Sequence, residues 1–507
     1  MAQFRKFKTT QNDEQQQNVI PPPPKELKKP GYKGRRNQAQ PTVAFPEIQR
    51  EALPEVTKNF ESSILKGSST PRRAATTSKT PNQEEKHTGA YILSTQSNQL
   101  TKFEQTEILQ YQRVSYWGQN ATKKYNISDT NFGYDDNRGD YLGVLKDHIA
   151  YRYETQSILG QGSFGKVFKA FDHQNNCFVA LKIVRNKKRF HRQGLVEVRL
   201  LETLRKNDPD DISCVLKLTH SFYFRSHLCI VTDMLSINLY ELLVRFNLKG
   251  LKLNYVKHIA VQCLNSLCYS HNLNIIHADI KPENILLVKE NSTHIRVIDW
   301  GSGAFVNQTI YTYIQSRFYR APEVILGMPY SIEIDVWSMG CVFAELLTGM
   351  PIFPGEDEHD QLGKICEFLN MPPNHMIQKA SRAGEFFQSG KLRSKHRPNS
   401  KSIQQHLKGQ PADFIDLICQ MLVWDPKQRA TPHQLMKHPF VVNNEYSIQM
   451  VGQLGQGAVT EADKAKIKEP ETENKFQAEE MGFKKPKSGT GSQLGTSSVQ
   501  LPDLKKI

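Results

Sequence analysis

The sequence predicts an α+β fold of two lobes, a β-rich first lobe followed by a mainly helical second lobe. Apolar segments recur with few breaks over residues 153–440. Early in this stretch, apolar runs flank a turn of two asparagines, which is typical of strand, turn and strand. Farther along, Ile259, Cys263, Leu264 and Leu267 recur at helical spacing. This stretch is long enough for two lobes with a ligand site between them.

Composition narrows the classes of protein to which the chain can belong. It has 507 residues, 66 Lys and Arg against 51 Asp and Glu, a net charge of +15, and 38% hydrophobic residues. An average globular chain has about 45–50% apolar residues, so we expect part of this chain not to fold alone. No run of about 18 apolar residues is present, which argues against a membrane span. Residues 1–8 lack the apolar centre of a secretion signal, and Ala2 excludes N-myristoylation.

The eight cysteines form no C-x-x-C pair. A zinc site or a disulfide framework is therefore not expected. We predict reduced thiols in the core, as in proteins of a reducing compartment.

Both ends of the chain are predicted to be disordered. Residues 1–95 are rich in Gln, Pro, Ser, Thr and Lys, and residues 1–90 carry 16 Lys and Arg against 9 Asp and Glu. Such a basic tail can attract nucleic acid by charge alone, but no nucleic-acid-binding motif is present, so no direct contact is expected. Residues 441–507 return to a polar composition and are also predicted to be a disordered tail. Between the first tail and the core, Phe103, Ile108 and Tyr111 have spacings compatible with a helix.

A glycine-rich segment opens the core at Gly160, Gly162 and Gly165. Glycines let the backbone approach phosphate oxygens without a Cβ in the way. A dinucleotide-binding loop would open a helix at this point. Here strand-like apolar residues follow from Val167, so a hairpin over the phosphates fits better.

A cation and a carboxylate follow the hairpin. Lys182 ends the run Val179-Ala-Leu-Lys, 17 residues after Gly165, and can hold the α- and β-phosphates of ATP. Glu197 lies in a segment of helical spacing and can face inward to pair with Lys182. Glu202 is the competing choice, although it lies one helical turn later.

Two polar segments carry the groups for phosphoryl transfer. In the run His277-Ala-Asp-Ile-Lys-Pro-Glu-Asn, Asp279 is placed to accept the proton of a substrate hydroxyl, Lys281 suits the γ-phosphate, and Asn284 can hold Mg²⁺. Asp299 follows an apolar run and would chelate the same ion. Glu323 and Arg429 are expected to form a buried structural pair.

With these motifs in chain order, residues 153–440 resemble a eukaryotic protein kinase. The segment 311–323, Tyr-Thr-Tyr-Ile-Gln-Ser-Arg-Phe-Tyr-Arg-Ala-Pro-Glu, resembles the dual-specificity tyrosine-phosphorylation-regulated kinases. Residues 134–141 and 147–154 resemble the DH box of that family. Residues 100–108 and 116–121 resemble the accessory region of its second class.

The resemblance implies a domain plan. It comprises a disordered basic tail (1–95), an accessory region with the DH box (96–152), an N-lobe (153–231), a hinge (232–235), a C-lobe (236–440) and a disordered tail (441–507). It also implies ATP and Mg²⁺ as cofactors. The nucleotide pocket would comprise Leu159, Gly160, Gln161, Gly162, Ser163, Phe164, Gly165, Val167, Ala180, Lys182, Asp233, Met234, Leu235 and Leu286.

By the same resemblance, the enzyme phosphorylates its own Tyr313 in cis while it matures and then acts on Ser or Thr, with a preference for proline after the target residue and often Arg at minus three. Arg317 and Arg320 would pair with the phosphotyrosine. Ala278 occupies the position at which many kinases carry an arginine for this task.

Four positions depart from the usual pattern of the family. Ala278 replaces the usual Cys, and Trp300 replaces the Phe of Asp-Phe-Gly, where its indole is expected to pack against the helix of Glu197. Thr232 replaces a gatekeeper Phe, which predicts a larger pocket behind ATP. Asp233 replaces a hinge Glu.

The resemblance predicts a dual-specificity protein kinase that acts on protein substrates, as a monomer in the cytoplasm, with entry to the nucleus left open. One alternative is a pseudokinase scaffold, but no catalytic residue is lost. Another is a nucleic-acid-associated protein that binds through its basic tail.

Overall fold

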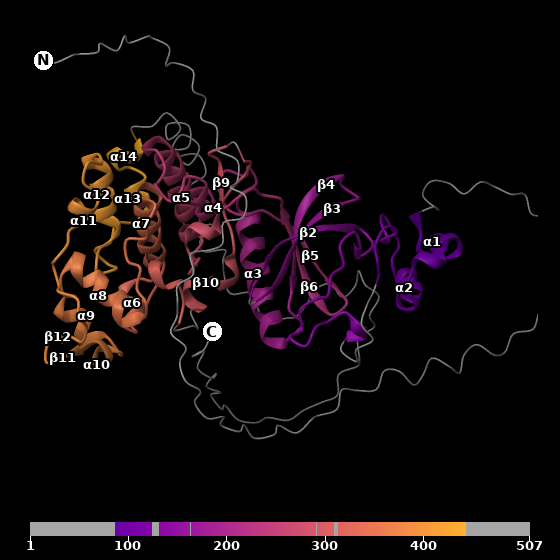
Figure 1. Cartoon of the computed structure of the whole chain (residues 1–507), viewed down its shortest axis with the longest axis horizontal. Coiled ribbons are helices and arrows are strands. Elements are labelled where there is room, and N and C mark those ends of the chain that lie inside the picture. Colours follow the sequence, from indigo (N-terminus) through magenta and orange to yellow (C-terminus); the bar gives the residue numbers. More distant parts are fainter. Residues whose placement is uncertain (1–86, 124–130, 163, 291, 309–312, 443–507) are drawn as a thin grey trace, which may run out of the picture.

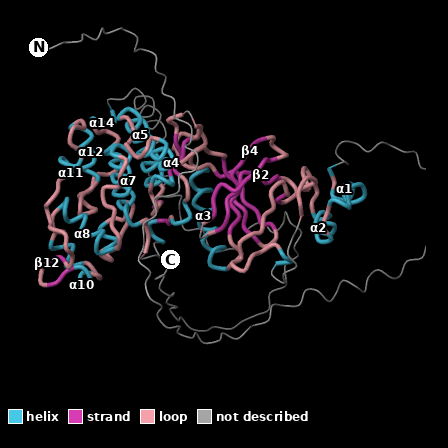
Figure 2. The backbone as a smooth tube through the Cα atoms, in the orientation of Figure 1, coloured by secondary structure: helices cyan, strands magenta, loops and turns pink. Residues whose placement is uncertain are grey.

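The two lobes predicted from the sequence are present and lie side by side along the long axis of the molecule (Figure 1). A twisted sheet with one long helix forms the first lobe, and helices form most of the second (Figure 2). Both predicted tails fall largely outside the described residues. The computed structural model describes residues 87–123, 131–162, 164–290, 292–308 and 313–442.

The first lobe contains a six-stranded antiparallel sheet with the strand order β1-β2-β3-β4-β6-β5. Alternate side chains of β3 and β4 are buried in one apolar cluster. Lys182 has the opposite parity in β4, so it points to the other face of the sheet. The strands are β1 (His148–Ile149), β2 (Tyr153–Gln161), β3 (Gly165–Asp172), β4 (Cys177–Val184), β5 (Leu218–Phe224) and β6 (His227–Asp233).

Helix α3 (Lys188–Lys206) follows β4 and packs on the sheet through β4, β5 and β6. Its inner face carries apolar residues such as Val198 and Leu201, as the helical spacing predicts. A Cβ at Gly194 would lie 2.8 Å from a methyl carbon of Leu228. The glycine therefore lets the helix approach the sheet closely.

The second lobe is mainly helical, with three small two-stranded sheets. Its helices are α4 (Leu239–Arg245), α5 (Leu253–Asn272), α6 (Pro322–Ile325), α7 (Glu333–Thr348), α8 (Glu358–Leu369), α9 (Asn374–Lys379), α10 (Ala383–Phe386), α11 (Ile403–His406), α12 (Ala412–Met421), α13 (Pro432–Leu435) and α14 (Pro439–Val442). Its strands are β7 (Ile275–Ile276), β8 (Ile285–Leu287), β9 (Ile295–Val297), β10 (Ala304–Phe305), β11 (Phe387–Gln388) and β12 (Lys391–Leu392).

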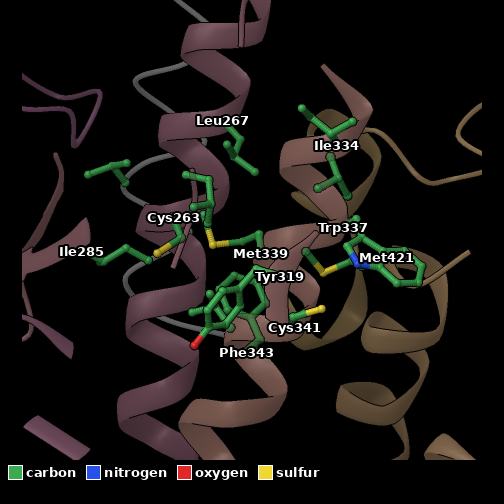
Figure 3. Close-up of a cluster of buried hydrophobic side chains, with 14 of the residues drawn as sticks. Cys263, Leu267, Ile285, Tyr319, Ile334, Trp337, Met339, Cys341, Phe343 and Met421 are labelled. Atoms are coloured by element: carbon green, nitrogen blue, oxygen red, sulfur yellow. The ribbon is translucent and has the colours of Figure 1, made fainter. Parts of the chain in front are cut away.

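The core of this lobe forms where α7 packs between α5 and α12. Figure 3 shows Met339 of α7 beside Cys263 of α5, and Trp337 beside Met421 of α12. These four side chains are at most 1% exposed. Helix α7 is buried on nearly all sides, which makes it a rigid support for the loops that pack on it.

Order begins earlier in the chain than the composition predicts. Helix α1 (Gly89–Gln96) starts inside the segment 1–95, which we predicted to be disordered, and that boundary is wrong. The side chain of Thr88 caps the first turn, and Ile92 packs with Ile108 in a small buried cluster. This short apolar stretch is hidden by the polar composition of the segment around it.

The helix expected around Phe103 is also shorter than its spacing suggests. Helix α2 (Lys102–Glu107) ends before Ile108, a 3₁₀ turn continues to Gln110, and Tyr111 has extended backbone. The helix begins with a capping box at Thr101. Its two glutamates are buried, because both meet an arginine of the first lobe.

That arginine, Arg225, joins the accessory region to the sheet. Its guanidinium Nη2 lies 2.7 Å from Oε2 of Glu107 and 3.1 Å from Oε1 of Glu104, and its side chain is 1% exposed. It also stacks 3.8 Å from the ring centre of Tyr134. Burial alone would raise the pKa of Glu104, but His148 and the nearby cations lower it.

The same ion pairs explain a buried group of potential metal ligands. Glu104, Asp147 and His148 place ligand atoms near one another. However, Lys123 Nζ lies 2.8 Å from Glu104 and 3.5 Å from Asp147. Lysine and Arg225 supply the positive charge there, so the group is a network of ion pairs that holds the accessory region in place.

Three further expectations need adjustment. The DH-box region contributes β1 to the sheet, so the first lobe includes residues before 153. Strand β6 runs to Asp233, which places the first two residues of the expected hinge in a strand. The last helix extends two residues past the predicted end of the core, to Val442.

All eight cysteines are free thiols, and six of them are buried. Cys177, at the start of β4, is exposed, and Cys419 is half-buried, so for these two the prediction of a core position is wrong. Among the described residues, no helix is both long enough and apolar enough to cross a membrane.

Replacing Arg225 with Ala should lower the free energy of unfolding by about 3–5 kcal/mol, because it leaves the buried carboxylate of Glu107 without the guanidinium that neutralises it and removes one partner of Glu104. Denaturant titration of purified protein measures this. Lys217→Ala is the control, since its pair with Asp211 is 3.7 Å long and solvent-exposed, and it should cost at most about 1 kcal/mol. Equal effects of the two variants would contradict a structural role for Arg225.

Candidate active site

The glycine-rich hairpin forms as predicted, between β2 and β3. The N–H of Gly162 donates to the carbonyl of Gly165 at 3.0 Å across the turn. A Cβ at Gly160 or Gly162 would meet nothing within 4 Å, so these two glycines leave open space over the hairpin. Gly165 has a different reason to be glycine: its φ is +147°, and a Cβ would lie 2.1 Å from the carbonyl of Ile183. Ser163, predicted in the pocket, lies outside the described residues.

Lys182 and Glu197 form the predicted ion pair between the sheet and α3. Lys182 Nζ donates to both carboxylate oxygens of Glu197, at 2.7 and 2.8 Å, and lies 3.5 Å from Oδ1 of Asp299. Burial lowers the pKa of Lys182, but Glu197 and Asp299 outweigh it and the pKa is raised. The lysine therefore stays charged. Glu202, the competing candidate, is exposed.

Asp279 lies at the centre of the catalytic loop predicted from the sequence. Its Oδ1 accepts hydrogen bonds from the Oγ and the backbone N–H of Ser316, at 2.7 and 3.0 Å. Lys281 Nζ donates to its Oδ2. The side-chain N–H of Asn284 donates a hydrogen bond to the backbone carbonyl of Asp279 at 2.9 Å. The amide oxygen is therefore the atom that Asn284 can offer to a metal ion.

A buried carboxylate that the sequence did not single out as functional holds this loop. Asp335 of α7 accepts the backbone N–H of His277 at 2.8 Å and that of Ala278 at 2.9 Å. Ala278 has φ +63°, a left-handed conformation that costs a residue with a Cβ about 1–2 kcal/mol. Asp335 stabilises that conformation. A carboxylate near the start of a mainly apolar helix was the signal in the sequence.

Asp299 begins the segment after β9 with a left-handed backbone, φ +61°. Burial raises the pKa of its carboxyl, but Lys182 and His277 more than offset this, and the pKa is lowered. The side chain is therefore an anion beside Lys182. An ionised carboxylate and an amide oxygen are the hard ligands that Mg²⁺ prefers.

Trp300 and Gly301 attach this segment to α3. Trp300 is 1% exposed, its indole N–H donates to the Val297 carbonyl at 3.2 Å, and its ring meets His277 edge-on at 4.7 Å. Gln193 of α3 donates to the carbonyl of Gly301. The prediction that the indole packs against the helix of Glu197 stays a prediction: the 3₁₀ turn Trp300–Ser302 lies against α3, and the ring itself meets His277. The hydrogen bond from Gln193 had no signal in the sequence.

The predicted adenine-binding residues come from both lobes. Thr232 and Ala180 are paired neighbours in β6 and β4, and Thr232 is 7% exposed. The backbone N–H of Ser236 donates to the carbonyl of Leu287, which brings β8 with Leu286 against the hinge. The remaining residues of the predicted pocket lie in β2 and β3 (Leu159, Gln161, Val167), in the turn between them (Phe164) and at the end of β6 and beyond (Asp233, Met234, Leu235).

Tyr313 lies on the surface of the segment after Asp299, with its side chain 55% exposed. The guanidinium of Arg320 stacks 4.1 Å from the ring centre and forms an ion pair with Glu358 at 2.9 Å. Arg317 donates to the backbone carbonyls of Gly355 and Glu356. Of the two predicted partners of Tyr313, the structure places Arg320 in contact with it.

The predicted structural pair is present. Arg429 donates to the two oxygens of Glu323 at 2.8 and 3.0 Å, and both side chains are fully buried. Arg429 also donates to the carbonyl of Glu333, where α7 begins. The pair therefore ties the end of the activation segment to the helix that carries Asp335.

Comparison with known proteins agrees with this geometry. The protein kinase domain family matches residues 153–441. Dual specificity tyrosine-phosphorylation-regulated kinase 4 of Homo sapiens is 46% identical over 398 residues, which are 75% of this chain and 76% of the relative. The chain belongs to the dual-specificity tyrosine-phosphorylation-regulated kinase family. It is therefore a protein kinase that uses ATP and a divalent metal ion and acts on protein substrates.

Two other relatives share the kinase region within longer chains. Dual specificity tyrosine-phosphorylation-regulated kinase 2 of Drosophila melanogaster is 45% identical over 68% of this chain and 49% of its own length. DYRK-family kinase pom1 of Schizosaccharomyces pombe is 46% identical over 68% of this chain and 33% of its own length. The chain thus spans half or less of the length of these two. No catalytic group is missing here, which argues against the pseudokinase alternative.

Replacing Asp335 with Asn should reduce kcat by about 100-fold, because a small displacement of the catalytic loop misplaces Asp279. The KM for ATP should change little, since Asp335 contacts the loop and not the hairpin. Steady-state kinetics on folded protein tests this, with Asp210→Asn on an exposed loop as control. An unchanged kcat at equal folded fraction would contradict the assigned role.

Proposed function

We propose that this kinase transfers the γ-phosphoryl group of ATP to Ser or Thr in protein substrates and, while it matures, to its own Tyr313. The closed contact of Lys182 with Glu197 and Asp299 carries the proposal. It supports a site in which the sheet, α3 and Asp299 are already arranged for transfer.

Each group has a distinct part in the reaction. Asp279 accepts the proton of the attacking hydroxyl, and Lys281 stabilises charge on the transferred group. Lys182 holds the α- and β-phosphates. Asn284 and Asp299 would hold Mg²⁺, which neutralises phosphate charge when bound.

The surroundings of Tyr313 support its role as the maturation site. A phosphate adds nearly two negative charges to an exposed ring that already lies on Arg320. Arg320 and, after a local side-chain movement, Arg317 pair with that phosphate. Because Ala278 cannot supply an arginine from the catalytic loop, pairing inside the activation segment stabilises the phosphorylated form.

Protein made in bacteria should carry phosphate on Tyr313 in most molecules, and an Asp279→Asn copy should carry none, because the modification needs the chain's own catalytic base. Phosphosite mass spectrometry checks both. Tyr223, 43% exposed, is the matched internal control and should stay unmodified. A folded wild-type chain without phosphate on Tyr313 would overturn self-maturation.

A backbone feature supports preference for proline after the target residue. Gln315 has φ +64°, and its carbonyl accepts hydrogen bonds from Arg320 at 2.8 and 3.3 Å. This carbonyl is thus turned inward, beside the Ser316 that bonds to Asp279. The backbone N–H of the substrate residue after the target therefore cannot use the Gln315 carbonyl as its acceptor. A buried N–H without an acceptor costs about 1–3 kcal/mol. Proline has no N–H to satisfy.

An exposed carboxylate near the same segment supports recognition of a basic substrate residue. Glu283 of the catalytic loop is exposed, and both Glu283 and Glu345 raise the pKa of the Tyr319 hydroxyl, after the larger effect of burial. Tyr319 donates to Glu345 at 2.7 Å. Burial, with help from Glu283, raises the pKa of Glu345 to about 7. We assign arginine at minus three to Glu283, because Glu345 is only 2% exposed and cannot meet a substrate.

Three peptides that differ only after the target serine separate the N–H effect from packing of the proline ring. With Pro at plus one, kcat/KM should be at least about tenfold higher than with Ala. N-methylalanine, which also lacks the N–H, should recover most of the difference. If N-methylalanine is as poor as Ala, contact with the ring sets the preference and the backbone explanation fails.

A further inference from the structure

A cavity of about 520 Å³ with an apolar floor and polar walls opens on the second lobe between α4, α5 and the β8–β9 hairpin. Its floor consists of four buried residues, Leu242, Leu251, Ile259 and Leu287. Adjacent residues of a strand face opposite sides, so Leu287 reaches the cavity while Leu286 belongs to the predicted nucleotide pocket. The cavity is therefore separate from the active site, although one short strand serves both.

The rim of the cavity fits an extended peptide with apolar side chains. Phe246 and Tyr255 are only half-buried and border the floor. Polar and basic residues such as Lys252 and Asn254 surround them. A bound peptide can bury its apolar side chains on such a floor, while its backbone lies near polar groups of the rim that can form hydrogen bonds with it. The volume is within the range of about 300–1,000 Å³ that is typical of ligand sites.

The described chain ends on α5, the helix that lines one side of this cavity. Helix α14 packs on α5, and Lys257 Nζ lies 5.4 Å from the ring centre of Phe440. Helix α5 also supplies Tyr255 and Ile259 to the cavity. Val442, the last described residue, is 40% exposed. Eight more residues in extended form reach at most about 29 Å.

The residues that follow have the pattern of such a peptide. The first large apolar residues after Val442 are Tyr446, Ile448 and Met450, and they alternate with Ser447 and Gln449. In extended backbone this alternation places all three apolar side chains on one side. Apart from Glu445, the charged residues of the tail begin only after residue 460.

We propose that residues 446–450 bind in this cavity, in extended conformation and within the same molecule, with their apolar side chains on its floor. Nearness to α14 favours this occupant over an external one, because a short linker gives an effective concentration of about millimolar. The inference does not depend on the substrates of the kinase.

Hydrogen–deuterium exchange on the full chain tests the proposal. The variant with Tyr446, Ile448 and Met450 all changed to Ser should exchange faster than wild type in α4 and the first half of α5. The matched control, Ser447→Ala with Gln449→Ala, should behave as wild type. Identical exchange in all three proteins would overturn the proposal. Protection that grows with protein concentration would instead indicate a second copy and overturn binding within one molecule.

A second measurement identifies the occupant directly. A labelled synthetic peptide of residues 443–456 should bind the full-length triple-Ser variant at least about tenfold more tightly than wild type, whose cavity is filled. Adding Tyr255→Ala to that variant should weaken binding again, with kinase activity unchanged. Fluorescence anisotropy measures both. Equal binding to wild type and variant, or none to either, would overturn the proposal.

Discussion

The buried ion pair of Lys182 and Glu197 is the contact on which the active geometry depends. It joins the sheet to α3, and through Asp299 it reaches the second lobe, so one cluster of three charges fixes three parts of the molecule. Removing such charges from water costs several kcal/mol each, and their mutual attraction offsets this cost only when the geometry of the contacts is good. Here the lysine nitrogen contacts both oxygens of Glu197. The cluster has a function that accounts for this desolvation cost, because it places a cation where the negative charge of the phosphates has to be held.

Helix α3 transmits this constraint, because it contacts the activation segment at more than one point. Glu197 faces Lys182, and one turn earlier Gln193 bonds to the Gly301 carbonyl. The indole of Trp300 is buried and rests on His277 of the catalytic loop. A movement of Asp299 out of the site would have to break the hydrogen bond to α3 and expose an indole. The departure at Trp300 therefore favours the closed arrangement.

Local chemistry explains which features were predictable from the sequence. The glycines at 160–165, Lys182 and Asp279 were predictable because phosphate binding and proton transfer restrict residue type at fixed spacing. The sheet followed from alternation of apolar residues, and α3 from helical spacing. By contrast, Asp335 bonds to backbone more than 50 residues away, and Glu104 and Glu107 of α2 pair with Arg225, more than 100 residues later. The spacing of residues along the chain does not reveal partners that are this far apart in the sequence.

Arg320 explains how the activation segment can be held without an arginine at position 278. Its guanidinium bonds to the carbonyls of Ile314 and Gln315, pairs with Glu358 and stacks on the ring of Tyr313. One buried cation thus orients the carbonyl near the substrate and stabilises the ring that would carry phosphate. An arginine in the catalytic loop would couple the phosphate to Asp279 directly. With alanine there, a phosphate on Tyr313 would act on the same segment that bonds to Asp279 through Ser316, and would reinforce an arrangement that is already formed.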